Sequence, residues 1–381
     1  QVLRQVRKDI KRNRKKKAVR RKNWMPDDGA DWDSLDCPQR ERIVPRGERA
    51  RRRMLWTKAL DQLEQDAAVG VSVPGAVESK GPVGRVVEVS SGLCRVELDE
   101  RSVLCALRGS LSAEDTGFTN VVAVGDRVVL SLDGADAGVI EAVLPRRTAL
   151  ARPDVFYSHL QQVLVANADQ LLIVSSWRDP AIWLELVDRF LITAERNSLW
   201  PVICLNKMDL AEDEGSARRT LLPYVDLGYD VLFTSARTAE GIDELREVLA
   251  GRMTVLAGLS GVGKSSLLAA VQPGLHLRTA EVSERRHEGR HTTSQVNLWK
   301  LELGGYVVDT PGIREFGLSG LRRDELYGCY PEMVAVSKDC RFVDCSHTHE
   351  PGCAVRQAVH RGQISRARYH SYRQIYDTLP F

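Results

Sequence analysis

The stretch GLSGVGKS at residues 258–265 decides the fold, because it matches the pattern G-x-x-x-x-G-K-[ST] of a phosphate-binding loop. It follows the apolar run 254–257 and precedes residues 265–268, which begin a helical pattern. In this setting the loop's backbone N–H groups and the helix N-terminus can surround phosphate oxygens. The stretch therefore predicts an α/β nucleotide-binding domain, in which Lys264 reaches the β- and γ-phosphates and Ser265 contacts Mg²⁺.

Short apolar runs lie on both sides of this loop. They occupy residues 170–175, 200–205, 231–234, 254–257 and 306–308, and residues 182–194 between the first two have helical spacing. Continuous apolar runs indicate strands buried on both faces, and their alternation with helices predicts a parallel sheet. Ligands of such sheets bind beyond the carboxyl ends of the strands. We therefore expect the polar motifs that follow these runs to line one site.

The tetrapeptide Asn206-Lys207-Met208-Asp209 directly follows the second run. Guanine presents two adjacent donors, N1–H and N2–H₂, and an ionised Asp209 can accept from both. Adenine offers no such pair, so ATP would leave this carboxylate unmatched. Ser235-Ala236, after the next strand, matches the companion loop that contacts guanine through a backbone N–H. These residues predict a guanine nucleotide rather than ATP.

The third motif, Asp309-Thr310-Pro311-Gly312, follows the last apolar run. Asp309 is expected to hold Mg²⁺ through water, and the Gly312 N–H to sense the γ-phosphate. An ordinary GTPase runs phosphate loop, then DxxG, then NKxD. Here the tetrapeptide 206–209 precedes the phosphate loop, and this order predicts a circularly permuted GTPase domain.

A polar stretch at residues 281–294 contains Gly289-Arg290-His291-Thr292-Thr293 and lies where a switch loop is expected. Thr293, with Thr292 as the alternative, is the candidate for Mg²⁺. Ile313 follows Gly312 where small GTPases usually place a glutamine that orients the attacking water, so intrinsic hydrolysis should be slow. His291 is the candidate for orienting that water, since imidazole can hydrogen-bond water near neutral pH. The alternative is a histidine that only packs or contacts RNA.

The expected cofactors of this site are GTP or GDP and Mg²⁺. The catalytic candidates are His291, Thr293 and Lys264, and the Mg²⁺ candidates are Ser265, Thr293 and Asp309. The residues expected to contact the nucleotide are Asn206, Lys207, Met208, Asp209, Ser235, Ala236, Gly258, Leu259, Ser260, Gly261, Val262, Gly263, Lys264, Ser265, Ser266, Thr292, Asp309 and Gly312.

Three of the eight cysteines lie close together near the C-terminus, in the pattern Cys340-x₄-Cys345-x-His347-x₅-Cys353. Three thiolates and one imidazole complete a tetrahedral Cys₃His zinc site, and four protein ligands leave no open position for catalysis. His349 is an alternative nitrogen ligand, and Cys329 a more distant possibility. The other cysteines are scattered and indicate reduced thiols of a cytoplasmic protein.

Before the nucleotide-binding region, about five short β-type runs broken by Gly and Asp predict a small barrel. An OB-fold is the natural candidate, with an SH3-like barrel as the alternative. The chain is thus expected to be multidomain. The predicted parts are a basic extension at residues 1–80, disordered or helical, the barrel at 81–148, the permuted GTPase domain at 149–320 and a mostly helical zinc-binding domain at 321–381.

Charge is distributed unevenly along the 381 residues. Residues 1–23 carry twelve Lys or Arg and one Asp, a net charge of +11, whereas the whole chain is +3 and the remainder therefore −8. A dense basic arm favours a polyanionic partner, and the alternative is a solvated tail with no specific partner. No apolar run reaches 18 residues and no secretory signal is visible, so neither a membrane span nor secretion is expected.

Together these motifs resemble, over about residues 80–381, the RsgA (YjeQ) family of ribosome-small-subunit-dependent GTPases. The resemblance implies an OB-fold, a permuted GTPase domain and a zinc-binding domain. It also implies a cytoplasmic late maturation factor of the 30S subunit, which binds 16S rRNA and hydrolyses GTP when bound there. We expect a monomer with no membrane or DNA partner. The alternatives are an RNA-binding scaffold with a structural guanine nucleotide, a P-loop ATPase or metabolic kinase, and a permuted GTPase of the large subunit.

Overall fold

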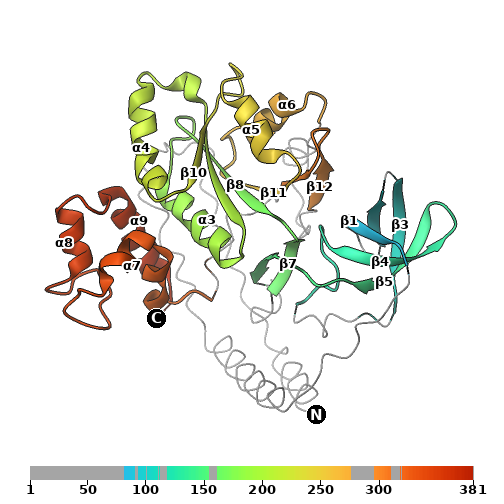
Figure 1. The fold of residues 1–381 in the computed structure, drawn as a ribbon, viewed down its shortest axis with the longest axis horizontal. Helices are drawn as coiled ribbons and strands as arrows, with labels where there is room; N and C mark the ends of the chain where they lie inside the picture. The colour runs from blue at the N-terminus through green and yellow to red at the C-terminus, as the bar shows by residue number, and fades with distance from the viewer. Residues whose placement is uncertain are drawn as a thin grey trace, which may run out of the picture. The chain divides into compact units, whose positions relative to one another are not determined.

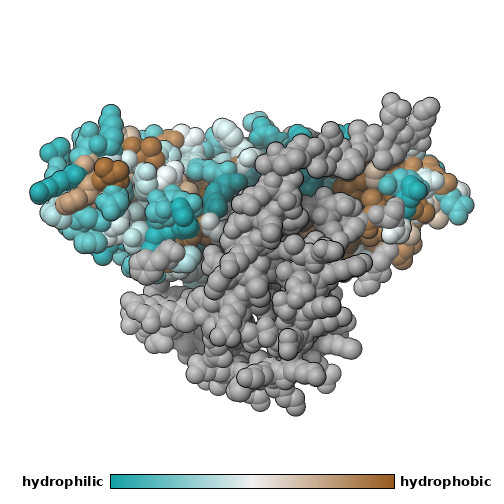
Figure 2. Space-filling view, turned by 90° about the horizontal axis from the view of Figure 1, so that it is seen from below, coloured by the Kyte–Doolittle hydropathy of each residue, from teal (hydrophilic) through white to brown (hydrophobic). Residues whose placement is uncertain are grey.

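The computed structural model describes residues 81–90, 93–99, 101–109, 111, 118–153, 161–275, 296–309, 318 and 320–380, all within one compact unit, residues 79–381 (Figure 1). The predicted basic extension, 1–80, lies outside them. None of the described helices combines the length and apolar character that a membrane crossing requires. In the view of Figure 2, hydrophilic residues cover much of the described surface and apolar residues form separate patches between them.

The first described region is a closed barrel of five strands. Its core holds inward-facing side chains of every strand, among them Val86, Val96, Val103, Leu130 and Ile140. β1 pairs with β2 and β4, β2 with β3, and β4 with β5, all antiparallel, while β3 and β5 are parallel. This is the five-stranded Greek-key arrangement of an OB-fold, as predicted. The strands are β1 (Val83–Ser90), β2 (Leu93–Leu98), β3 (Arg101–Leu107), β4 (Arg127–Asp133) and β5 (Ala137–Val143).

A parallel sheet follows, with strand order β10-β9-β8-β11-β13 and the antiparallel strand β12 beside β13. The five predicted apolar runs form its parallel strands. A separate hairpin, β6 (Ala149–Pro153) with β7 (Gln161–Ala166), precedes it and was not predicted. The strands of the sheet are β8 (Gln170–Ser176), β9 (Trp200–Asn206), β10 (Asp230–Phe233), β11 (Met253–Ala257), β12 (Asn297–Lys300) and β13 (Tyr306–Asp309).

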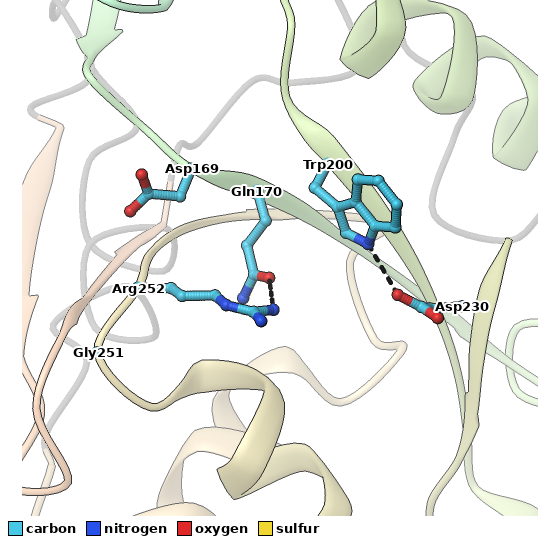
Figure 3. A pocket seen from close by; sticks show the side chains of 6 residues that line it. All are labelled: Asp169, Gln170, Trp200, Asp230, Gly251 and Arg252. Atoms are coloured by element: carbon cyan, nitrogen blue, oxygen red, sulfur yellow. Dashed lines mark hydrogen bonds between the residues drawn. The ribbon is translucent and has the colours of Figure 1, made fainter.

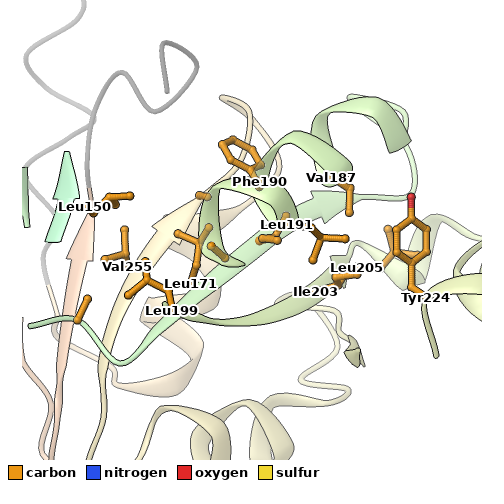
Figure 4. Close-up of a cluster of buried hydrophobic side chains, with 14 of the residues drawn as sticks. Leu150, Leu171, Val187, Phe190, Leu191, Leu199, Ile203, Leu205, Tyr224 and Val255 are labelled. Carbon is orange, nitrogen blue, oxygen red and sulfur yellow. The ribbon is translucent and has the colours of Figure 1, made fainter. Parts of the chain in front are cut away.

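Helices cover both faces of this sheet, which explains why its strands are apolar throughout. On one face, α3 and α4 pack on alternate residues such as Leu171 and Ile203 (Figure 4). On the other, α5 and α6 pack on Leu172, Val174 and Leu256. The helices are α3 (Leu184–Arg196), α4 (Glu214–Asp226), α5 (Ile242–Leu249) and α6 (Lys264–Val271), with a 3₁₀ turn η3 (Met208–Leu210) after β9.

The C-terminal region is helical, as predicted. It consists of the 3₁₀ segment η5 (Arg323–Cys329) and the helices α7 (Pro331–Ser337), α8 (Ala354–His360) and α9 (Arg366–Thr378). Their core includes Tyr330, Met333 and Tyr372, and Ile192 of α3 packs into it. The region therefore shares an apolar core with a helix of the parallel sheet.

A buried ion-pair cluster joins α9 to α3 within this contact. Arg368 of α9 is 2% exposed and pairs with Asp188 of α3, which is fully buried. Its Nε also donates to Oε1 of Glu332 in α7 at 2.8 Å. The guanidinium lies 4.5 Å from the ring centre of Tyr330 and 5.1 Å from that of Tyr224. Burial by itself lowers the pKa of Arg368, but the carboxylates of Asp188 and Glu332 outweigh this and hold its pKa well above the ordinary value.

Candidate functional site

The glycine-rich loop bridges the end of β11 and the start of α6, as the sequence predicts. Gly258, Gly261 and Gly263 have φ angles of 142°, 82° and 95°, a region that favours glycine. A Cβ on Gly258 would lie 2.1 Å from the carbonyl oxygen of Val174 in β8. The glycines therefore let the backbone curl against the sheet, with Ser265 and Ser266 in the first turn of α6.

The Lys264 side chain lies across this loop. Its Nζ donates to the carbonyl oxygens of Gly258 and Leu259, both at 3.0 Å. Asp309 ends the neighbouring strand β13 and is 6% exposed. Burial raises the pKa of the Asp309 carboxyl, and the positive charge of Lys264 partly offsets this. The predicted phosphate-binding lysine and the predicted Mg²⁺ aspartate thus belong to one site.

The predicted base-reading tetrapeptide touches the glycine-rich loop directly. Nδ2 of Asn206, at the end of β9, donates to the carbonyl oxygen of Val262 at 2.8 Å, across 56 residues of sequence. Oδ1 of Asn206 accepts from the backbone N–H of Ala236 at 3.3 Å. A Cβ on Gly263 would lie 2.3 Å from Nδ2 of Asn206, so the contact also requires this glycine. Three segments distant in sequence therefore converge at the carboxyl edge of the sheet.

Asp209 points into the same region and is 11% exposed. Its Oδ1 accepts from the Ser235 hydroxyl at 2.6 Å, and its Oδ2 lies 3.6 Å from a guanidinium nitrogen of Arg237. Lys207 has the left-handed φ of 62°, and its Nζ donates to the carbonyl oxygen of Asp179. Met208 is 1% exposed, so its side chain belongs to the core rather than to the site.

Two contributors to this region were missed in the sequence. Arg237 directly follows Ser235-Ala236, so its position beside that loop was the available signal. Asp179 lies in the connection from β8 to α3, and only a carbonyl oxygen takes part, which no sequence pattern reveals. Four predicted site residues, His291, Thr292, Thr293 and Gly312, lie outside the described residues, as does Ile313.

The predicted zinc ligands come together. One ligand atom from each of Cys340, Cys345, His347 and Cys353 lies within 4.8 Å of all the others. Nδ1 of His347 is 3.5 Å from Sγ of Cys340 and 3.6 Å from Sγ of Cys353. The two sulfurs are 4.0 Å apart. His349 is 82% exposed, and neither it nor Cys329 belongs to this group.

The surroundings of these four residues suit a metal. The Ala354 N–H donates to Sγ of Cys340 at 3.3 Å, and the Tyr369 hydroxyl donates to the His347 carbonyl oxygen at 2.7 Å. Burial lowers the pKa of the His347 imidazole, with Glu350 acting in the opposite direction. A neutral imidazole with a free nitrogen is the form that binds metals.

A hollow of about 430 Å³ lies at the opposite, amino edge of the parallel sheet (Figure 3). Trp200 and Asp230 begin β9 and β10 there, and the indole Nε1 donates to Oδ2 of Asp230 at 2.7 Å. Arg252 donates to Oε1 of Gln170 at 3.1 Å. Because these polar groups pair with one another, the hollow holds no convergent set of groups aimed at a ligand.

Comparison with known proteins identifies the family. A family model described as RsgA GTPase matches residues 143–319. The small ribosomal subunit biogenesis GTPase RsgA of Moorella thermoacetica is 43% identical over 289 residues, which cover 76% of this chain and 94% of that protein. Its namesake from Thermotoga maritima is 40% identical over 299 residues, covering 78% and 96%.

Two solved structures have the same fold. The crystal structure of YjeQ from Thermotoga maritima matches with a TM-score of 0.64 and 38% identity, covering 78% of this chain and 98% of that one. YloQ, described as a circularly permuted GTPase, matches with a TM-score of 0.61 and 30% identity, covering 81% and 99%. The chain therefore belongs to the RsgA family of GTPases, enzymes that hydrolyse GTP.

Proposed function

We propose that this GTPase acts in the cytoplasm as a monomer, binds the 16S rRNA of the 30S subunit late in assembly and hydrolyses GTP there, faster than when free. The main support for the nucleotide site is the Asn206–Val262 hydrogen bond. It joins the predicted guanine-binding residues, 206–209, to the predicted phosphate-binding loop, 258–265. The relatives are named small ribosomal subunit biogenesis GTPases, which supports the choice of partner.

In the guanine half, Asp209 is the proposed specificity residue. Ser235 fixes its carboxylate by donating to one oxygen, and Arg237 balances the charge from the exposed side. Guanine N1–H and N2–H₂ are the donors that an ionised, nearly buried carboxylate selects. Asn206 and Lys207 join the guanine half to neighbouring loops through their contacts with Val262 and Asp179.

In the phosphate half, the loop N–H groups and Lys264 would hold the phosphates. Lys264 now donates to two loop carbonyls, which a phosphate oxygen can replace as the stronger acceptor. Ser265 and Thr293 would offer Mg²⁺ the hydroxyl oxygens that it prefers, Asp309 would hold the ion through water, and the bound ion would neutralise developing phosphate charge. His291 is proposed to orient the attacking water.

Asp209→Asn tests the guanine assignment. The amide loses one acceptor and the charge of the carboxylate, so GTP should bind about 100-fold more weakly, roughly the contribution of one charged hydrogen bond. Xanthosine triphosphate should bind the variant more tightly than it binds the wild type, because its C2 carbonyl can accept from the new amide N–H₂. Affinities for both nucleotides would be measured by fluorescence titration. Asp213→Asn, an exposed acid paired with Arg219, is the control. Unchanged GTP preference would refute the assignment.

We also propose that Cys340, Cys345, His347 and Cys353 hold one structural Zn²⁺. Zn–S bonds of about 2.3 Å and a Zn–N bond of about 2.0 Å in a tetrahedron put ligand atoms roughly 3.5–3.8 Å apart. The described distances of 3.5, 3.6 and 4.0 Å fit this spacing. The ion would tie the loop 340–353 to α8.

Zinc content tests this site. Purified protein should contain about one zinc per chain, and Cys345→Ser should contain close to none, since three ligands hold the ion far less tightly. Cys329→Ser removes a neighbouring thiol outside the cluster and should keep its zinc. Elemental analysis would measure the metal, and near-ultraviolet circular dichroism would follow the nearby tyrosines. Equal zinc in both variants would exclude the assignment.

Turnover measured alone, with 30S and with 50S particles tests the proposed partner. Stimulation by 30S alone is the expected result. A scaffold with a structural nucleotide would show none, and a large-subunit factor would respond to 50S.

A further inference from the structure

The barrel is joined by backbone pairing to the strands that lead into the candidate GTP site. β1 pairs with β12 at Glu88 and Asn297, β12 pairs with β13 at Asn297 and Asp309, and β13 pairs with β11 at Asp309 and Leu256. One row of residues thus runs from a barrel strand through the proposed Mg²⁺ aspartate to the strand that enters the glycine-rich loop.

Side chains of the barrel hold the same two strands at a second point. Glu97 of β2 is 17% exposed, and its Oε1 lies 2.5 Å from Nζ of Lys300 in β12. Its Oε2 accepts from the Tyr306 hydroxyl of β13 at 2.6 Å. Arg85 of β1 lies 4.9 Å from the centre of the Tyr306 ring. Lys300 and Tyr306 are cross-strand partners, so the carboxylate of Glu97 contacts both strands of the β12–β13 hairpin.

The contacts of Glu97 with Lys300 and Tyr306 lie close enough to Asp309 to affect its position. Tyr306 and Asp309 are three residues apart on one strand, about 10 Å, and rigid secondary elements can carry coupling between two sites. A hollow of about 210 Å³, lined by Val87, Glu97, Leu298 and Tyr306 among others, lies beside the contact. Apart from the backbone pairing of β1 with β12, the barrel and the hairpin therefore meet through a few polar contacts with space beside them.

We propose that the barrel sets the position of the β12–β13 hairpin, with Glu97 as the positioning residue, and that the small subunit stimulates GTP hydrolysis by displacing the barrel. The inference rests on the proposed function, and it assigns the barrel as the contact with rRNA because OB-folds commonly bind oligonucleotides. Glu97 is not among the candidate nucleotide or Mg²⁺ residues. Its effect passes through Lys300 and Tyr306 to Asp309.

Glu97→Gln and Tyr306→Phe test the coupling, since each weakens one contact without changing the side chain's shape. Each should lower 30S-stimulated kcat about tenfold, within the usual range of coupling between sites. GTP affinity, 30S affinity and turnover without 30S should stay within about twofold of wild type, because the variants weaken only the contact through which the barrel acts and leave Asp309 itself unchanged. The double variant should be no worse than the more affected single variant, since both act through the carboxylate of Glu97. Glu141→Gln, which breaks the barrel pair with Arg108, is the matched control.

The possible outcomes test this inference separately from the proposed function. If 30S stimulates wild type and Glu97→Gln equally, the coupling is wrong and the proposed function stands. If Glu97→Gln binds 30S tenfold more weakly, Glu97 acts in binding, and the coupling is again wrong. If 30S does not stimulate wild type, both proposals fall. Loss of stimulation with intact binding and non-additive single variants supports the coupling.

Discussion

Replacing Lys264 with alanine is expected to reduce GTP hydrolysis about 1,000-fold, because removing one preorganised charged donor at a transition state typically costs 10²–10³ in kcat. Lys264 spans the glycine-rich loop, and its charge acts on the Asp309 carboxyl. Without it, the charge that develops on the transferred phosphate loses its nearest side-chain donor on this loop. Single-turnover hydrolysis with saturating GTP would measure the loss.

Two further variants make this test specific. Lys264→Arg should also be poorly active, because a planar guanidinium does not replace a compact ammonium between two loop carbonyls. Lys338→Ala, an exposed lysine of the C-terminal region, should keep full activity. Turnover of Lys264→Ala within tenfold of wild type would contradict the role of the loop as the catalytic phosphate site.

Replacing Arg368 with methionine is expected to lower the free energy of unfolding by about 3–5 kcal/mol, the usual cost of leaving a buried charge without its partner. Asp188 is fully buried, and Arg368 is its ion-pair partner between α3 and α9. Burial raises the pKa of Asp188, and the Arg368 charge opposes that rise. Removing the arginine therefore leaves a carboxylate that is costly in either protonation state. Urea unfolding followed by circular dichroism would give the change.

Two control variants test whether burial of the ion pair causes the loss of stability. Arg322→Gln breaks an ion pair with Asp324 in which both side chains are at least 60% exposed, and should cost less than about 1 kcal/mol. Combining Arg368→Met with Asp188→Leu should recover part of the loss, since the buried charge at position 188 of α3 is then removed together with its partner. If Arg368→Met were as stable as Arg322→Gln, the cluster would not anchor the C-terminal region.

The sequence predicted the parallel sheet well because a strand that is buried on both faces appears in the sequence as a continuous apolar run. The runs that became β8, β9 and β11 are apolar without interruption, and each ends at a polar or glycine-rich motif. The hairpin β6–β7 and strand β12 left no such trace. β12 is four residues long, and its identity as a strand depends on β13 and on β1, more than 200 residues earlier.

The same distinction holds for the candidate sites. The four zinc ligands lie within fourteen residues, so spacing alone brought them together. The sequence favoured His347 and left His349 as the alternative, and the structure confirms His347 as the member of the cluster. Arg237 and the Asp179 carbonyl were missed because their contacts depend on how distant loops meet. The roles of His291 and Thr293 stay predictions.

During synthesis, β8, β9 and β10 leave the exit tunnel before β11, although β11 lies between β8 and β13 in the finished sheet. The nascent chain can therefore pair three strands while the inner edge of β8 still lacks its neighbour. Open apolar edges of this kind pair readily with foreign strands. The swapped motif order thus leaves the inner edge of β8 unpaired until β11, Met253–Ala257, has been synthesised.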